Sequence, residues 1–212
     1  MKNINLSVIL AIMVFPGAGQ NIKLTKVKEL GISFGTFNTI NKNKVTVSPS
    51  ISGYLDDYYF ENRYNYEADN SASINVGKRI LKKLNNIEVV PMGGLVFGSF
   101  KGVTAELQTS FIYNKWIFST DNQFSFEYRQ PDKSLYFNWT MAIFKLTNSF
   151  RIGLTTFLDK HAVKNIAFDK GITAAILFKQ WGLRFYAFNY EIEKRYYWIS
   201  IRYNIKAMII SK

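Results

Sequence analysis

The sequence predicts an all-β protein: a closed, antiparallel, up-and-down transmembrane β-barrel of about 12 strands. Three observations lead to this fold class: apolar and polar residues alternate along the chain, short turns separate the alternating segments, and the N-terminus has the pattern of an export signal. Apolar residues make up 48% of the 212 residues, yet the mean hydropathy is only −0.06. The apolar residues are therefore interleaved with polar ones, which favours strands over buried helices.

Residues 1–19 are predicted to be a signal peptide, and residues 20–212 a single outer-membrane β-barrel domain. Lys2 precedes an apolar run at residues 8–15, and small residues follow before Gln20. The run is shorter than the roughly 20 residues that a membrane-spanning helix needs. The alternative is a buried N-terminal helix. The signal predicts export to the cell outer membrane, with the barrel assembly machinery and outer-membrane lipids as partners.

Five stretches show the two-residue period of half-buried strands most clearly. In one of them, Val103, Ala105 and Leu107 share one face, opposite Thr104 and Glu106. Two asparagines, Asn62 and Asn122, interrupt otherwise apolar faces. For residues 135–146 either facing fits, and the orientation is left open because a one-residue slip would exchange the two faces. The five stretches are residues 72–77, 103–113, 150–158, 181–187 and 197–205.

The connections between strands predict which end of the barrel faces the periplasm. The short ones, at residues 56–57, 114–115, 147–149 and 179–180, follow even-numbered strands, whereas the longest, at 37–44 and 159–169, follow odd-numbered ones. With both termini in the periplasm, short turns lie inside and long loops outside. A soluble sandwich or a lipocalin-like barrel is the alternative, but it does not predict this parity. Interfacial aromatics are expected at Trp116, Trp181, Tyr197 and Tyr203.

The sequence offers little for catalysis, so we expect no enzyme, no cofactor and no metal site. Cysteine is absent and His161 is the only histidine, predicted inside a loop. A lipid-modifying outer-membrane enzyme is the alternative, but a Ser-His pair needs a histidine oriented by a third group. Asp56 and Asp57 are interpreted as turn residues, and the glycines at 93, 94 and 98 as relief of crowding within strands.

The candidate functional residues are the charged side chains predicted to face the lumen. Early strands supply mostly acids and late strands supply arginines, so an acidic wall is expected to face a basic one across the ring. A water-filled lumen would make a narrow, porin-like channel for small polar, zwitterionic or anionic solutes. Pairing of the charges would instead seal a structural barrel. The predicted pore-lining residues are Glu61, Arg63, Glu67, Arg79, Glu88, Glu106, Asp121, Glu127, Arg151, Arg184 and Arg202.

The net charge of +12 suits an anionic partner. No basic recognition helix or stacking motif is found, so nucleic acid is not expected as a partner. Lipopolysaccharide phosphates are the candidate partner of a lysine-rich rim, and a simply solvated rim is the alternative. The rim lysines, in or beside predicted external loops, are Lys42, Lys44, Lys101, Lys133, Lys160, Lys164 and Lys170.

Four motifs, at residues 64–67, 91–98, 136–139 and 199–204, resemble a family of small, uncharacterised outer-membrane β-barrels of the Bacteroidetes type. The resemblance implies the barrel fold and its location, and no catalytic residue. The chain is similar to nucleoside channels only in size and strand number. Two features depart from the family pattern: the high positive charge, and an apolar tail that ends on Lys212 where such barrels commonly end on an aromatic residue.

Overall fold

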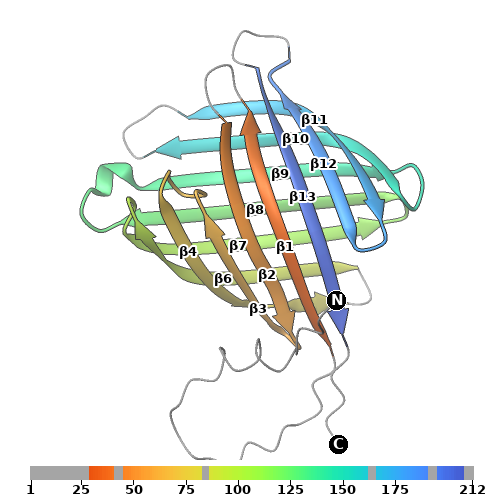
Figure 1. The fold of residues 1–212 in the computed structure, drawn as a ribbon, viewed down its shortest axis with the longest axis horizontal. Coiled ribbons are helices and arrows are strands. Elements are labelled where there is room, and N and C mark those ends of the chain that lie inside the picture. The colour runs from red at the N-terminus through yellow and green to blue at the C-terminus, as the bar shows by residue number, and fades with distance from the viewer. Residues whose placement is uncertain (1–28, 41–44, 83–85, 162–165, 191–194, 208–212) are drawn as a thin grey trace, which may run out of the picture.

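The computed structural model describes residues 29–40, 45–82, 86–161, 166–190 and 195–207, and these residues form one barrel (Figure 1). The predicted signal peptide and the C-terminal tail lie outside the described residues. Among the described residues, no helix is long and apolar enough to cross a membrane. The strand segments are β1 (Leu30–Ile40), β2 (Val45–Leu55), β3 (Tyr58–Tyr64), β4 (Ser71–Lys78), β5 (Ile80–Lys82), β6 (Ile87–Gly98), β7 (Gly102–Tyr113), β8 (Trp116–Glu127), β9 (Leu135–Lys145), β10 (Phe150–His161), β11 (Ala167–Phe178), β12 (Trp181–Phe188) and β13 (Tyr196–Ala207), with one 3₁₀ turn at Pro131–Lys133.

The barrel closes between its first and last strands. β1 pairs antiparallel with β13 from Leu30, opposite Ala207, to Ile40, opposite Tyr197. β4 and β5 both pair with β6 in one unbroken register, so they form a single barrel strand interrupted at Arg79. The described residues therefore make a closed antiparallel barrel of twelve strands, which confirms the predicted fold class.

The two ends of the barrel differ as the connection lengths predict. The two-residue turns at residues 56–57, 114–115 and 179–180 lie at the same end as Leu30 and Ala207, which we call the turn end. Positive φ angles of 56° at Asp56, 52° at Asn114 and 51° at Lys179 give these turns the backbone twist that tight hairpins require. The longer connections, such as residues 65–70 and 128–134, lie at the opposite loop end.

Three boundaries were predicted wrongly. The connection expected at residues 37–44 is shorter, because β1 continues to Ile40. The connection expected at 159–169 is also shorter, because β10 ends at His161, whose backbone pairs with Leu135. His161 is thus the last residue of a strand and not a loop residue. β3 ends at Tyr64, so Glu67 belongs to the connection between β3 and β4.

The outer surface of the barrel is largely apolar. On β7, the side chains of Val103 and Leu107 are exposed. Thr104 and Glu106, which lie between them in the sequence, are only 5% and 4% exposed. Apolar side chains outside and polar ones inside are the reverse of a water-soluble barrel. This arrangement suits a barrel whose outer wall contacts lipid.

Strand β9 is an exception to this apolar outer surface. Its structure also shows which face of residues 135–146 points inward, which the sequence left open. Its odd-numbered residues point inward, with Phe137 5% and Trp139 8% exposed. Its outward side chains join those of β8: the Asn138 amide donates to Asn122 Oδ1 at 2.7 Å and to Thr120 Oγ1 at 3.0 Å. We call Thr120, Asn122, Tyr136, Asn138 and Thr140 the outer polar network. Its members form hydrogen bonds with one another, which lowers the free-energy cost of placing polar groups on an apolar wall.

Two of the three glycines singled out in β6 are required by close packing or by backbone conformation. A Cβ on Gly94 would overlap the carbonyl oxygen of Ile74 and the side chain of Asn75. Gly98 has a φ of +106°, in a region that residues with a side chain rarely adopt. At Gly93, in contrast, a Cβ would lie 3.9 Å from its nearest neighbour, the carbonyl oxygen of Thr104. Crowding thus explains Gly94 and not Gly93.

Candidate functional site in the lumen

The lumen has a tightly packed half beside strands β3 to β8, and Arg63 is at its centre. The Arg63 Nη2 atom lies 2.7 Å from Glu106 Oε2, 2.7 Å from Gln123 Oε1 and 3.6 Å from Glu67 Oε1. The side chains of Arg63, Glu67 and Glu106 are at most 3% exposed. Asn75 and Gln123 beside them are completely buried. This half of the lumen is filled by side chains.

The connection between β3 and β4 brings two residues into this packed half. Asn65, with a φ of 55°, turns the chain at the end of β3, and its side-chain amide donates to the carbonyl of Val47. Glu67 then reaches Arg63 and accepts a hydrogen bond from Gln123. The Tyr66 ring covers the Arg63 guanidinium at 4.1 Å. Burial raises the pKa of Tyr66 well above its usual value, so this ring remains uncharged.

Two further predicted acids, Glu61 and Glu127, are also engaged with neighbours. Glu61 accepts hydrogen bonds from Tyr59 and Gln108 at 3.4 Å. Glu127 is 3% exposed and accepts backbone N–H bonds from Lys101 and Gln130, so it fixes the connections at the loop end.

Two predicted residues pair with each other near the turn end. Arg79 Nε lies 3.0 Å from Glu88 Oε1, and the Arg79 guanidinium covers the Tyr54 ring at 3.9 Å. Asp121 lies on the inner face of β8 between these groups and the Arg63 cluster. The predicted acidic wall is therefore mostly a buried network, although Glu88 and Asp121 line a cavity together with Arg202.

The late strands form a different surface, with three arginines around open space. Arg151 and Arg184 flank Ala175 on adjacent strands, and Arg202 lies between Gly35 and Gly182. These small neighbours leave a cavity of about 300 Å³, the basic cavity. Its lining holds all three arginines and, as far as the structure describes the chain, no Asp or Glu. Among the ion pairs that the described residues form, none involves these arginines.

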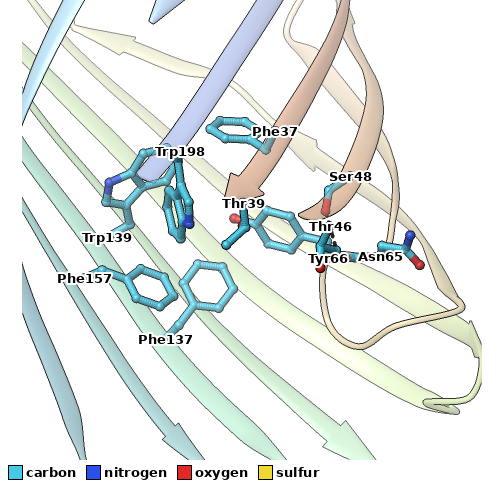
Figure 2. A pocket seen from close by; sticks show the side chains of 10 residues that line it. All are labelled: Phe37, Thr39, Thr46, Ser48, Asn65, Tyr66, Phe137, Trp139, Phe157 and Trp198. Atoms are coloured by element: carbon cyan, nitrogen blue, oxygen red, sulfur yellow. Dashed lines mark hydrogen bonds between the residues drawn. The ribbon is translucent and has the colours of Figure 1, made fainter. Parts of the chain in front are cut away.

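Two further cavities occupy the lumen. One of about 240 Å³ lies between the basic wall and the acids near the turn end, with Arg202, Glu88 and Asp121 in its lining. The other, of about 190 Å³, lies toward the loop end and is surrounded by aromatic rings (Figure 2). We call it the aromatic cavity. Its ring-bearing lining residues are Phe37, Tyr66, Phe137, Trp139, Phe157 and Trp198.

Trp139 lines all three cavities. Its indole N–H donates to Thr155 Oγ1 at 2.9 Å, which holds the ring in place. The three cavities therefore have this side chain as a common part of their walls.

The sequence did not identify the aromatic lining, because one of its members lies on a segment wrongly predicted as a loop and two lie on a strand whose facing was left open. Phe37 was assigned to a loop, and Phe137 and Trp139 lie on the strand whose facing was left open. The available signal was the alternation of Leu135, Phe137 and Trp139 with polar residues. Among the described residues, no three His, Asp or Glu side chains are placed to hold a metal ion.

Comparison with solved structures places the fold among outer-membrane porins. The KdgM porin superimposes with a TM-score of 0.56 at 10% identity, over 81% of this chain and 98% of the porin. The NanC porin gives a TM-score of 0.59 at 10% identity, over 84% of this chain and all of the porin. Another KdgM structure, described as a complex with disordered oligogalacturonate, matches equally well, with a TM-score of 0.56. Neither a protein-family model nor a curated protein sequence matches this chain.

Proposed function

We propose that this protein is a narrow outer-membrane channel that conducts small polar solutes and prefers anions. The observation that carries the proposal is the basic cavity, in which Arg151, Arg184 and Arg202 surround about 300 Å³ and no acidic residue of the described part of the chain joins the lining. The similarity of the fold to porins supports a membrane pore of this size. The apolar outer wall supports a location in the outer membrane.

The preference for anions follows from which charges remain accessible. The carboxylates of Glu67 and Glu106 are buried against Arg63, whereas Arg202 is exposed to the lumen. A solute that passes Trp139 therefore meets guanidinium groups at close range. Fixed charges that line a narrow passage select ions of the opposite sign.

A sealed structural barrel is the competing function, and the packed half of the lumen favours it. Arg63 and its partners fill the space beside β3 to β8, and the Trp139 ring forms part of the wall of each remaining cavity. In a sealed barrel the three cavities would be isolated pockets without passage between them. Conductance separates the two functions.

The test is a planar-bilayer measurement on the refolded protein with a salt gradient. We expect discrete channels whose reversal potential shows anion preference, and we expect Arg184→Gln to reduce that preference. Arg129→Gln, which removes the same charge from an exposed loop position, is the matched control and should leave the reversal potential unchanged. A protein that inserts but conducts no ions would overturn the channel.

We also propose that the lysines of the loop end bind lipopolysaccharide phosphates. Lys101, Lys133, Lys160 and Lys170 lie at this end of the barrel, whereas Lys42, Lys44 and Lys164 lie outside the described residues. Clustered cations near a membrane surface attract anionic head groups by roughly 1 kcal/mol each. Retention on lipid A vesicles that falls as salt rises is the expected result, and salt-independent retention would contradict it.

A further inference from the structure

The aromatic cavity has walls that stand nearly at right angles. Trp139 and Trp198 meet at an interplanar angle of 87°, and Phe37 meets these two rings at 76° and 81°. Phe157 stands at 73° to Trp198 on the adjoining side. Figure 2 shows these rings and Tyr66 surrounding the open space from several sides.

Perpendicular rings of this kind favour a compact cation with an apolar surface. Ring faces carry partial negative charge and attract a quaternary ammonium group by cation–π interaction. The Tyr66 ring is already covered by Arg63 at 4.1 Å, so the tryptophan and phenylalanine rings would supply this attraction. Among the described residues the lining contains no Asp, Glu, Lys or Arg, and its members without a ring are Thr39, Thr46, Ser48 and Asn65. An unmethylated ammonium would lose water hydrogen bonds on entering and regain few of them. An N-methylated cation has no such hydrogen bonds to lose.

The basic cavity adjoins the aromatic cavity directly. Phe37 and Trp139 line both of them, so the two cavities lie on either side of these shared rings. On the basic side, Arg184 lies 3.3 Å from the Tyr186 hydroxyl, and its guanidinium is available to an anion together with those of Arg151 and Arg202. The lumen thus offers a site for a methylated cation next to a site for an anion.

We propose that the lumen binds small zwitterions in which a quaternary ammonium group is joined by a short linker to a carboxylate. The ammonium group occupies the aromatic cavity, and the carboxylate contacts the arginines of the basic cavity. This inference rests on the proposed function, because it names the class of solute that the channel accepts. The cation site and the anion site each recognise a different group of the solute. Each group, and each site, can therefore be removed separately in an experiment.

The experiment is calorimetric titration of the full-length protein in detergent with glycine betaine. Glycine carries the same carboxylate with an unmethylated ammonium, tetramethylammonium chloride carries only the cation, and sodium acetate carries only the anion. We expect glycine betaine to bind, and each of the other three probes to bind at least roughly tenfold more weakly, as expected for loss of a desolvated cation–π or ion-pair contact. This comparison uses the unaltered protein and does not depend on the folding of a variant.

Variants then assign the site. Trp198→Leu and Arg184→Gln should each weaken glycine betaine binding by about tenfold, and heat-modifiable gel mobility checks that both variants are folded. Trp181→Leu is the matched control, because Trp181 is 53% exposed on the outer wall, and it should leave binding unchanged.

The outcomes separate the inference from the proposed function. Equal binding of glycine and glycine betaine, or no binding of either by a protein that conducts anions, overturns the inference and leaves the channel standing. Binding of glycine betaine by a protein that conducts no ions supports the inferred site and overturns the channel. Binding that survives both Trp198→Leu and Arg184→Gln overturns the assignment to these cavities.

Discussion

Replacing Arg63 by methionine tests the packed half of the lumen most directly. The substitution removes the 2.7 Å contacts to Glu106 and Gln123, the 3.6 Å contact to Glu67 and the guanidinium that covers Tyr66. Glu106 and Glu67, whose side chains have no exposed surface, would then lack their cation. Removing one partner of a buried ion pair costs about 3–5 kcal/mol, because the remaining charge is left unpaired. We expect Arg63→Met to lose that much free energy of unfolding.

The assay is reversible urea unfolding in detergent or lipid vesicles, followed by tryptophan fluorescence. The double variant Arg63→Met/Glu106→Gln should regain a large part of the loss, since it removes an unpaired carboxylate together with the arginine. Arg129→Met, at an exposed loop position, controls for the loss of one positive charge and should change stability by less than about 0.5 kcal/mol.

Two results would refute the reasoning. A loss below about 1 kcal/mol for Arg63→Met would show that the cation is not required to balance the buried carboxylates. Stability losses that simply add in the double variant would show that Arg63 and Glu106 do not interact.

Three further predictions concern the barrel wall and the Trp139 side chain. Gly94→Ala should destabilise the barrel by about 1–3 kcal/mol through overlap with Ile74, while Gly93→Ala should be tolerated; equal effects in urea unfolding would contradict the packing argument. Asn138→Leu should cost about 1 kcal/mol because it leaves polar neighbours in the outer wall with fewer partners, and adding Asn122→Leu should restore stability; a further loss in the double variant would argue against the network. Trp139→Leu should raise single-channel conductance, since its ring lines all three cavities, and an unchanged conductance would place the constriction elsewhere.

Much of the barrel could be predicted because its strands obey a period of two. In β7, the inward facing of Thr104 and Glu106 follows from the outward facing of Val103 and Leu107, and the structure has the same arrangement. The parity of the connections similarly predicted which end holds the tight turns. Both features depend on local sequence, which is why no information on tertiary contacts was needed.

The facing of β9 could not be predicted, because its two faces are chemically similar. The inward face carries Phe137 and Trp139, and the outward face carries Tyr136 and Phe144 beside polar residues. Only the contact with Thr120 and Asn122 on the outer face of β8 distinguishes them, and that contact is a property of two strands together. The inward positions of Phe137 and Trp139 in the aromatic cavity were missed for this reason, and Phe37 was missed because it was assigned to a loop.

The Arg63 network could not be predicted from alternation either. Glu67 reaches Arg63 because the chain turns at Asn65, and a turn ends the two-residue period that assigned both residues to one strand. Strand patterns identify which charges face inward. They do not show which of those charges neutralise each other and which remain accessible.

The pairing of β1 with β13 has a consequence for how the chain could be rearranged. The ends of these strands, Leu30 and Ala207, are register partners at the turn end, so a short added peptide could join them. New termini could then be opened at the Asn114-Lys115 turn, which lies at the same end. Such a circular permutant retains every neighbouring strand pair. The β1–β13 pair that closes the ring is an antiparallel ladder like any other pair. The order of strands in the sequence is therefore one of several that are compatible with the same ring.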